Sequence, residues 1–115
     1  MIALARGEAV ELPDTAAISI ITLCGLHHGV LVADDRQRPG RLAALTMAER
    51  RFRPLPLDER VPQHYGRILA DARRAGRRPG MADSLIAATA AANDLAVYTR
   101  DEDFLGLSGI EVVLT

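Results

Sequence analysis

Hydrophobic residues alternate along the chain between short β-branched runs and longer stretches with helical spacing. Strands are expected over 16–21, 53–57, 95–99 and 110–115. Helices are expected where apolar residues recur every three or four positions, over 22–34, 39–52, 58–76 and 81–94. Strands and helices in alternation predict an α/β fold with a parallel sheet flanked by helices.

Local residue chemistry sharpens several of these elements. Thr22 is expected to cap the first helix, Asp58 to cap the third, and Gly76 to end it. The run 53–57 contains two prolines, which predicts an edge strand. The helix over 81–94 is alanine-rich and apolar almost all round, so it is expected to be buried.

Composition limits the class of protein. At 115 residues with 49% hydrophobic residues, the chain fits one domain with one core. No apolar run approaches the ~20 residues that cross a bilayer, and the acidic opening does not resemble a secretion signal. A cytoplasmic protein is therefore expected. The single cysteine, Cys24, cannot form an internal disulfide.

Charge is unevenly distributed although the net charge is −1. Every basic residue is arginine, and 12 of the 14 lie between Arg36 and Arg78. That middle segment carries about +8, while both flanking segments are acidic. A basic segment beside acidic ones suits a phosphate-bearing partner, and solvated helix faces are the alternative.

Three aspartates are expected to meet at one edge of the sheet. Asp101 and Asp103 follow the strand 95–99, and Asp83 lies at the start of the preceding helix. In open α/β sheets the ligand site lies beyond the carboxyl ends of the strands, near helix N-termini. Carboxylates this close repel one another, and oxygen ligands alone select Mg²⁺ or Mn²⁺. A plain acidic turn, with Arg100 neutralising one acid, is the alternative.

Two stretches of the sequence resemble PIN-domain proteins of the VapC toxin type. They are "LPLDERVPQHYGRILADARRAGRRPGMADSLIAATAAANDLAVYTRDEDF" (55–104) and "AISIITLCGLHHGV" (17–30), and with the closing "GLSGIEVV" they cover nearly the whole chain. The resemblance implies a PIN-like α/β fold, a homodimer, and cleavage of RNA with Mg²⁺ or Mn²⁺. It also implies a VapB-like antitoxin as a partner.

The resemblance assigns roles to particular residues. The family builds its metal site from four acids, of which the third falls on Asp83 and the fourth on Asp101. Asp103 matches a further acid that supports the metal site or adds to it as a ligand. Four arginines around the loop "RRAGRRPG" are implied to hold the RNA backbone: Arg73, Arg74, Arg77 and Arg78.

The sequence departs from the family pattern at the other two acids. Gly25 stands where the family carries a glutamate. The segment "MIALARGEAVELPD" resembles the end of the family's first helix and the loop after it, so Met1 is expected to fall past the first aspartate. Residues 1–115 are then expected to form a single PIN-like domain without its first, central strand. An upstream start codon and a degenerate, truncated copy both explain this.

Three functions remain open at this point. The first is a PIN-type ribonuclease, the toxin of a toxin–antitoxin pair, impaired by the loss of two acids. The second is an inactive PIN remnant that binds an antitoxin or a paralogue. The third is an unrelated Mg²⁺-dependent phosphoryl-transfer domain.

Overall fold

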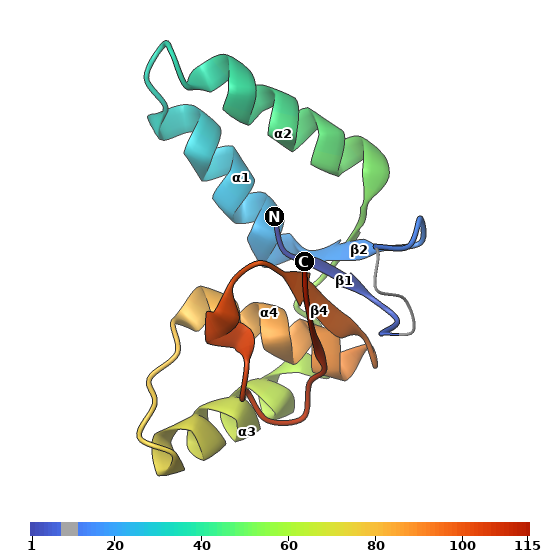
Figure 1. Ribbon diagram of the computed structural model, residues 1–115, viewed down its shortest axis with the longest axis vertical. Coiled ribbons are helices and arrows are strands. Elements are labelled where there is room, and N and C mark those ends of the chain that lie inside the picture. The colour runs from blue at the N-terminus through green and yellow to red at the C-terminus, as the bar shows by residue number, and fades with distance from the viewer. Residues whose placement is uncertain (8–11) are drawn as a thin grey trace.

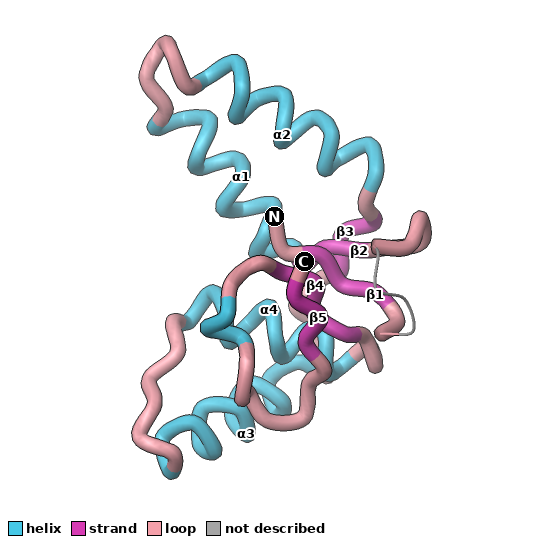
Figure 2. The backbone as a smooth tube through the Cα atoms, viewed as in Figure 1, coloured by secondary structure: helices cyan, strands magenta, loops and turns pink. Residues whose placement is uncertain are grey.

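A computed structural model describes residues 1–7 and 12–115 and has a five-stranded sheet at its centre (Figures 1 and 2). The strands lie in the order β3-β2-β1-β4-β5. Their bounds are β1 Ala3–Ala5, β2 Ala17–Ser19, β3 Arg53–Leu55, β4 Ala96–Thr99 and β5 Val112–Leu114. The α/β fold with a helix-flanked sheet is confirmed, and β3 lies at an edge as its prolines predict.

Four α-helices and one short 3₁₀ turn connect the strands. They are α1 Ile20–Val32, α2 Arg38–Arg51, α3 Val61–Arg74, α4 Met81–Ala92 and η1 Glu102–Phe104. All four helices were expected from the periodicity of apolar residues. The prediction that α4 is buried is also confirmed, because half of its residues are buried.

The central strand corrects two expectations. The family's first, central strand was expected to be missing, and β1 takes the central position of the sheet. The sheet was expected to be parallel, and β1 runs antiparallel to both β2 and β4, with Leu4 opposite Ala17 and Val97. The backbone groups on the facing edges of β2 and β4 need hydrogen-bonding partners, and β1 supplies these partners by pairing antiparallel with both strands. Residues 3–5 are thus not the end of a helix, and residues 8–11 of that predicted segment lie outside the described part.

Two predicted caps are wrong in detail. Ser19 rather than Thr22 caps α1, and its Oγ accepts from the Ile21 N–H at 3.1 Å. Asp58 does not cap α3 directly, because its carboxylate instead accepts from the Arg60 N–H at 2.9 Å and the helix begins one residue later. The end of α3 is as expected, since Gly76 adopts a φ of 74°, which a glycine tolerates.

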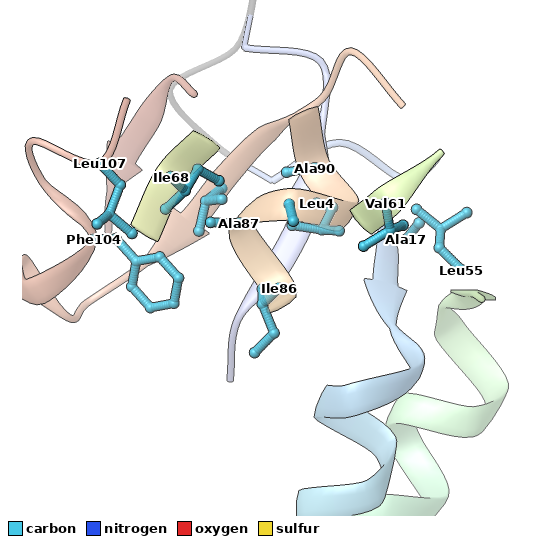
Figure 3. Packing of buried hydrophobic residues seen from close by; sticks show 12 residues of the cluster. Leu4, Ala17, Leu55, Val61, Ile68, Ile86, Ala87, Ala90, Phe104 and Leu107 are labelled. Atoms are coloured by element: carbon cyan, nitrogen blue, oxygen red, sulfur yellow. The ribbon is translucent and has the colours of Figure 1, made fainter. Parts of the chain in front are cut away.

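The helices divide into two pairs that relate differently to the sheet. Figure 1 shows α3 and α4 lying together against the sheet, while the α1–α2 hairpin extends away from it. The larger core cluster lies between the sheet, α3 and α4, and Figure 3 shows its side chains. It includes fully buried Leu4, Ile68, Val97 and Phe104. The acid-bearing segments of the chain therefore rest on the best-packed part of the molecule.

Candidate metal centre

The three predicted acids gather where α4 begins and β4 ends. Asp83 lies in the first turn of α4, where the exposed backbone N–H groups favour negative charge. Asp101 caps η1, and its Oδ1 accepts from the Asp103 N–H at 2.8 Å. The Asp101 N–H in turn donates to Oγ1 of buried Thr99 at 3.0 Å. These bonds fix how Asp101 leaves the end of the strand.

The electrostatics show that the three carboxylates act on one another. Partial burial raises the pKa of Asp83, and the negative charges of Asp101 and then Asp103 raise this pKa further. In the described part of the chain, no arginine forms an ion pair with any of the three acids. The cluster therefore carries negative charge that no cationic side chain among residues 1–7 and 12–115 balances by an ion pair.

The acids do not form a closed metal cage on their own. Within residues 1–7 and 12–115, no three His, Cys, Asp or Glu side chains are arranged as a metal-binding group. Carboxylate oxygens whose negative charge is not balanced are the type of ligand that Mg²⁺ and Mn²⁺ prefer. Asp83, Asp101 and Asp103 are the acids that offer carboxylate oxygens where α4 begins and β4 ends.

The opposite side of the site has no matching acids. Gly25 lies exposed on α1, and a Cβ placed there would meet no atom within 4 Å. Because β1 is reversed, its amino end lies beside the carboxyl end of β4, with Ala3 opposite Tyr98. Residues at that end of β1 are apolar, and α1 contains no acidic residue. The structure thus brings Asp83 and Asp101, the two acids assigned by the resemblance, to one place.

A polar hollow of about 290 Å³ adjoins the acids. Its walls come from the loop before α4 and from the acidic cluster: Arg77, Arg78, Pro79, Gly80, Asp83 and Asp103. A second hollow of about 430 Å³ lies beside it and shares its arginines; Leu69, Arg73, Arg77, Arg78 and Pro79 line it. Cationic side chains therefore border the acidic cluster on the side of the α3–α4 loop.

The four arginines predicted to bind RNA have different surroundings. Arg74 forms an ion pair with Asp71 at 2.8 Å. Arg77 donates to the carbonyl oxygens of Asp103 and Leu105, both at 2.8 Å. The side chains of Arg73 and Arg78 are exposed and form no hydrogen bond or ion pair with the rest of the described chain. Sequence reasoning missed the bonds made by Arg77, since nothing in the loop composition distinguishes it from its neighbours.

Comparison with known proteins assigns this arrangement to a family. A model of the PIN domain matches residues 3–109. Ribonuclease VapC4 of Mycobacterium tuberculosis is 34% identical over 96 residues, which cover 84% of this chain and 74% of that protein. In the part of the chain that the structure describes, no helix is long and apolar enough to span a bilayer.

Solved structures agree with the sequence relatives. The structure of VapBC-5 from Mycobacterium tuberculosis, a toxin–antitoxin system, matches with a TM-score of 0.79 and 33% identity, over 86% of this chain and 81% of that one. DNA-bound VapBC from Salmonella typhimurium matches with a TM-score of 0.73 and 30% identity, over 84% and 72% of the two chains. The chain therefore belongs to the PIN-domain family, and within it to the VapC ribonucleases.

Proposed function

We propose that this protein is the toxin of a VapB–VapC type pair and a metal-dependent endoribonuclease with a weakened metal site. The carrying observation is the convergence of Asp83, Asp101 and Asp103, where partial burial and then the negative charges of Asp101 and Asp103 raise the pKa of Asp83. The proposal treats residues 1–115 as one PIN-like domain acting as a cytoplasmic homodimer. It is supported by relatives named ribonucleases and by neighbours solved as VapBC complexes.

The residues present fit a hard divalent cation. Asp83 and Asp101 would hold Mg²⁺ or Mn²⁺, and Asp103 would support Asp101 through its N–H bond. When bound, such an ion lowers the pKa of a coordinated water and offsets charge on the phosphate in RNA cleavage. With only two of the four acids of the PIN pattern in place, we expect weak metal binding and slow cleavage.

The arginines near the site would hold the RNA backbone. Arg73 and Arg78 line the hollows beside the acids and have no competing protein partner in the described chain. Their guanidinium groups can bind phosphate oxygens on either side of the scissile bond. With 3% aromatic residues, the chain offers few rings for base stacking, so affinity should come mainly from charge.

A ribonuclease assay with and without Mg²⁺ tests this function. Cleavage of single-stranded RNA should require Mg²⁺ or Mn²⁺, and Asp83→Asn should lower it about 100-fold by removing a ligand while keeping the shape of the side chain. Glu102→Gln is the control, since Glu102 lies beside the acids but does not appear among the causes of the raised Asp83 pKa. Cleavage that survives both chelation and Asp83→Asn would contradict the proposal.

A second function, a non-catalytic binding module, is favoured by the α1–α2 hairpin and by the missing acids. α2 forms a hollow of about 690 Å³ lined by Pro39, Leu42, Ala43, Thr46, Met47, Arg50 and Arg51. No residue of the apolar helix α1 is buried, and Leu31 is 81% exposed. Such a surface suits a VapB-like antitoxin or a paralogue. Tight antitoxin binding with no Mn²⁺ binding in calorimetry would establish this function over the first.

A further inference from the structure

Arg77 makes the most extensive contact between the basic loop and the acidic turn. Its Nη1 donates to the Leu105 carbonyl and its Nη2 to the Asp103 carbonyl, each at 2.8 Å. One planar guanidinium thus holds two carbonyls from the same turn, 26 and 28 residues away in sequence. Hydrogen bonds from a charged donor are about twice as strong as neutral ones, so this clamp has substantial strength.

The backbone of Arg77 is itself anchored. The Arg77 N–H donates to the Ala72 carbonyl at 2.8 Å, where Gly76 turns the chain at the end of α3. On the other side, Gly106 leaves space for the guanidinium, because a Cβ there would lie 2.9 Å from Arg77 Nη1. Gly106 also has a φ of 81°, which favours glycine. Both ends of the clamp are therefore built for this contact.

The clamped turn is the one that carries the acids. Asp101 accepts from the Asp103 N–H, so the two residues move together, and Phe104 below them is fully buried. Arg77 binds two backbone carbonyls of this turn and forms no ion pair with its carboxylates. It can therefore fix their position without neutralising them.

We propose that Arg77 is a positioning residue that holds Asp101 and Asp103 in place opposite Asp83. The inference deepens the proposed function and rests on it for its catalytic meaning. It separates Arg77 from the arginines that would contact RNA. Arg77 acts on the acidic turn, whereas its neighbour Arg78 borders the same hollow and makes no hydrogen bond to the turn.

The chain offers two matched controls. Arg78 is adjacent in sequence and exposed, so Arg78→Lys changes the same chemistry without touching the turn. Arg67 contacts the segment between η1 and β5 further along the chain. Its Nη1 donates to the Ser108 carbonyl at 2.7 Å and to Ser108 Oγ at 3.0 Å. Arg67→Lys therefore loosens the loop away from the acids.

The experiment compares Arg77→Lys, Arg78→Lys and Arg67→Lys in the full chain by hydrogen exchange of amides 103–107. A lysine keeps the charge but cannot span both carbonyls. We expect Arg77→Lys to speed exchange of the Asp103 and Leu105 amides about 10-fold, and Arg78→Lys to leave it unchanged. Mn²⁺ affinity in calorimetry should fall about 3- to 10-fold in Arg77→Lys alone.

The kinetic readout separates positioning from RNA contact. In Arg77→Lys, kcat should fall while KM for RNA stays within about 2-fold, whereas Arg78→Lys should raise KM. Equal exchange in the Arg77 and Arg78 variants would overturn the proposal, as would an equal loss of Mn²⁺ affinity in Arg67→Lys. If the unaltered protein binds no Mn²⁺, the proposed function fails, and amide exchange alone decides for or against the clamp.

Discussion

The two sides of the site differ in how firmly they are built. On the α4–β4 side, the acids rest on buried residues such as Ala87, Val97 and Phe104, and Arg77 clamps the turn that carries two of them. On the α1–β1 side, α1 has no buried residue and no acid, and Gly25 is exposed. The three acids therefore lie beside the well-buried helix α4, and the exposed helix α1 contributes none of them.

On the α1–β1 side, the antiparallel strand β1 contributes backbone pairing and buried side chains. Its three residues are almost completely buried, and they pair with β2 and β4. Backbone pairing in the centre of the sheet works in either direction, although parallel and antiparallel bonding patterns differ. The direction of the strand decides which side chains lie near the acids. The amino end of β1 lies beside the carboxyl end of β4, and its residues are apolar. β1 thus completes the sheet without completing the site.

The largest expected effect comes from breaking the packing under the acidic turn. Phe104 is fully buried, and Phe104→Ala should lower the free energy of unfolding by about 3–5 kcal/mol in urea denaturation. Leu105→Ala is the control, because Leu105 is 43% exposed and should lose about 1 kcal/mol or less. Similar losses in both variants would show that the turn is not packed as described.

The second prediction restores an acid on the weaker side. Gly25→Glu adds a carboxylate where a Cβ has free space, and Mn²⁺ affinity in calorimetry should rise about 10-fold. Gly25→Gln has the same shape without the charge and should leave the affinity unchanged. Both variants should gain about 0.5 kcal/mol of stability from improved helix propensity. An equal gain in affinity with glutamine would show that the charge of the carboxylate is not its cause.

A smaller effect is expected from the arginines that border the site. Arg78→Ala should weaken binding of single-stranded RNA a few-fold and reduce the slope of log affinity against log salt by about 0.7. Arg36→Ala removes the same charge from the α1–α2 turn, away from the acids (Figure 1). It should change neither quantity by as much, and equal effects would indicate that net charge alone attracts RNA.

The smallest effect concerns stability and pH. Because the pKa of Asp83 is raised in the folded protein, the folded state binds its proton more tightly than the unfolded state does. The free energy of unfolding should then fall as pH rises from the ordinary pKa through the raised one. Asp83→Asn should remove this fall, with a gain at pH 7 below about 1 kcal/mol because Asp83 is only partly buried and solvent screens it. A variant less stable than the parent at pH 7 would contradict the repulsion.

Periodicity and local residue chemistry predicted most of the fold. The helices α1 to α4 follow from apolar spacing, and β4 from its apolar run. Cap positions were less accurate, since Ser19 and Thr22 are both good capping residues and only the observed backbone selects Ser19. The grouping of Asp83 with Asp101 was also predictable. A helix that leads into a strand packs antiparallel to it, so the first turn of the helix lies near the carboxyl end of the strand.

The sequence by itself determined the helices, the positions of the acids and the resemblance to PIN-domain proteins. Tertiary structure decided the direction of β1 and the role of Arg77. The sequence of β1, Ala-Leu-Ala, is the same in both directions and therefore does not determine the orientation of the strand. The orientation depends on how its backbone pairs with β2 and β4. An arginine in a basic loop has five donors and a long reach, and only the fold places the carbonyls of Asp103 and Leu105 within that reach.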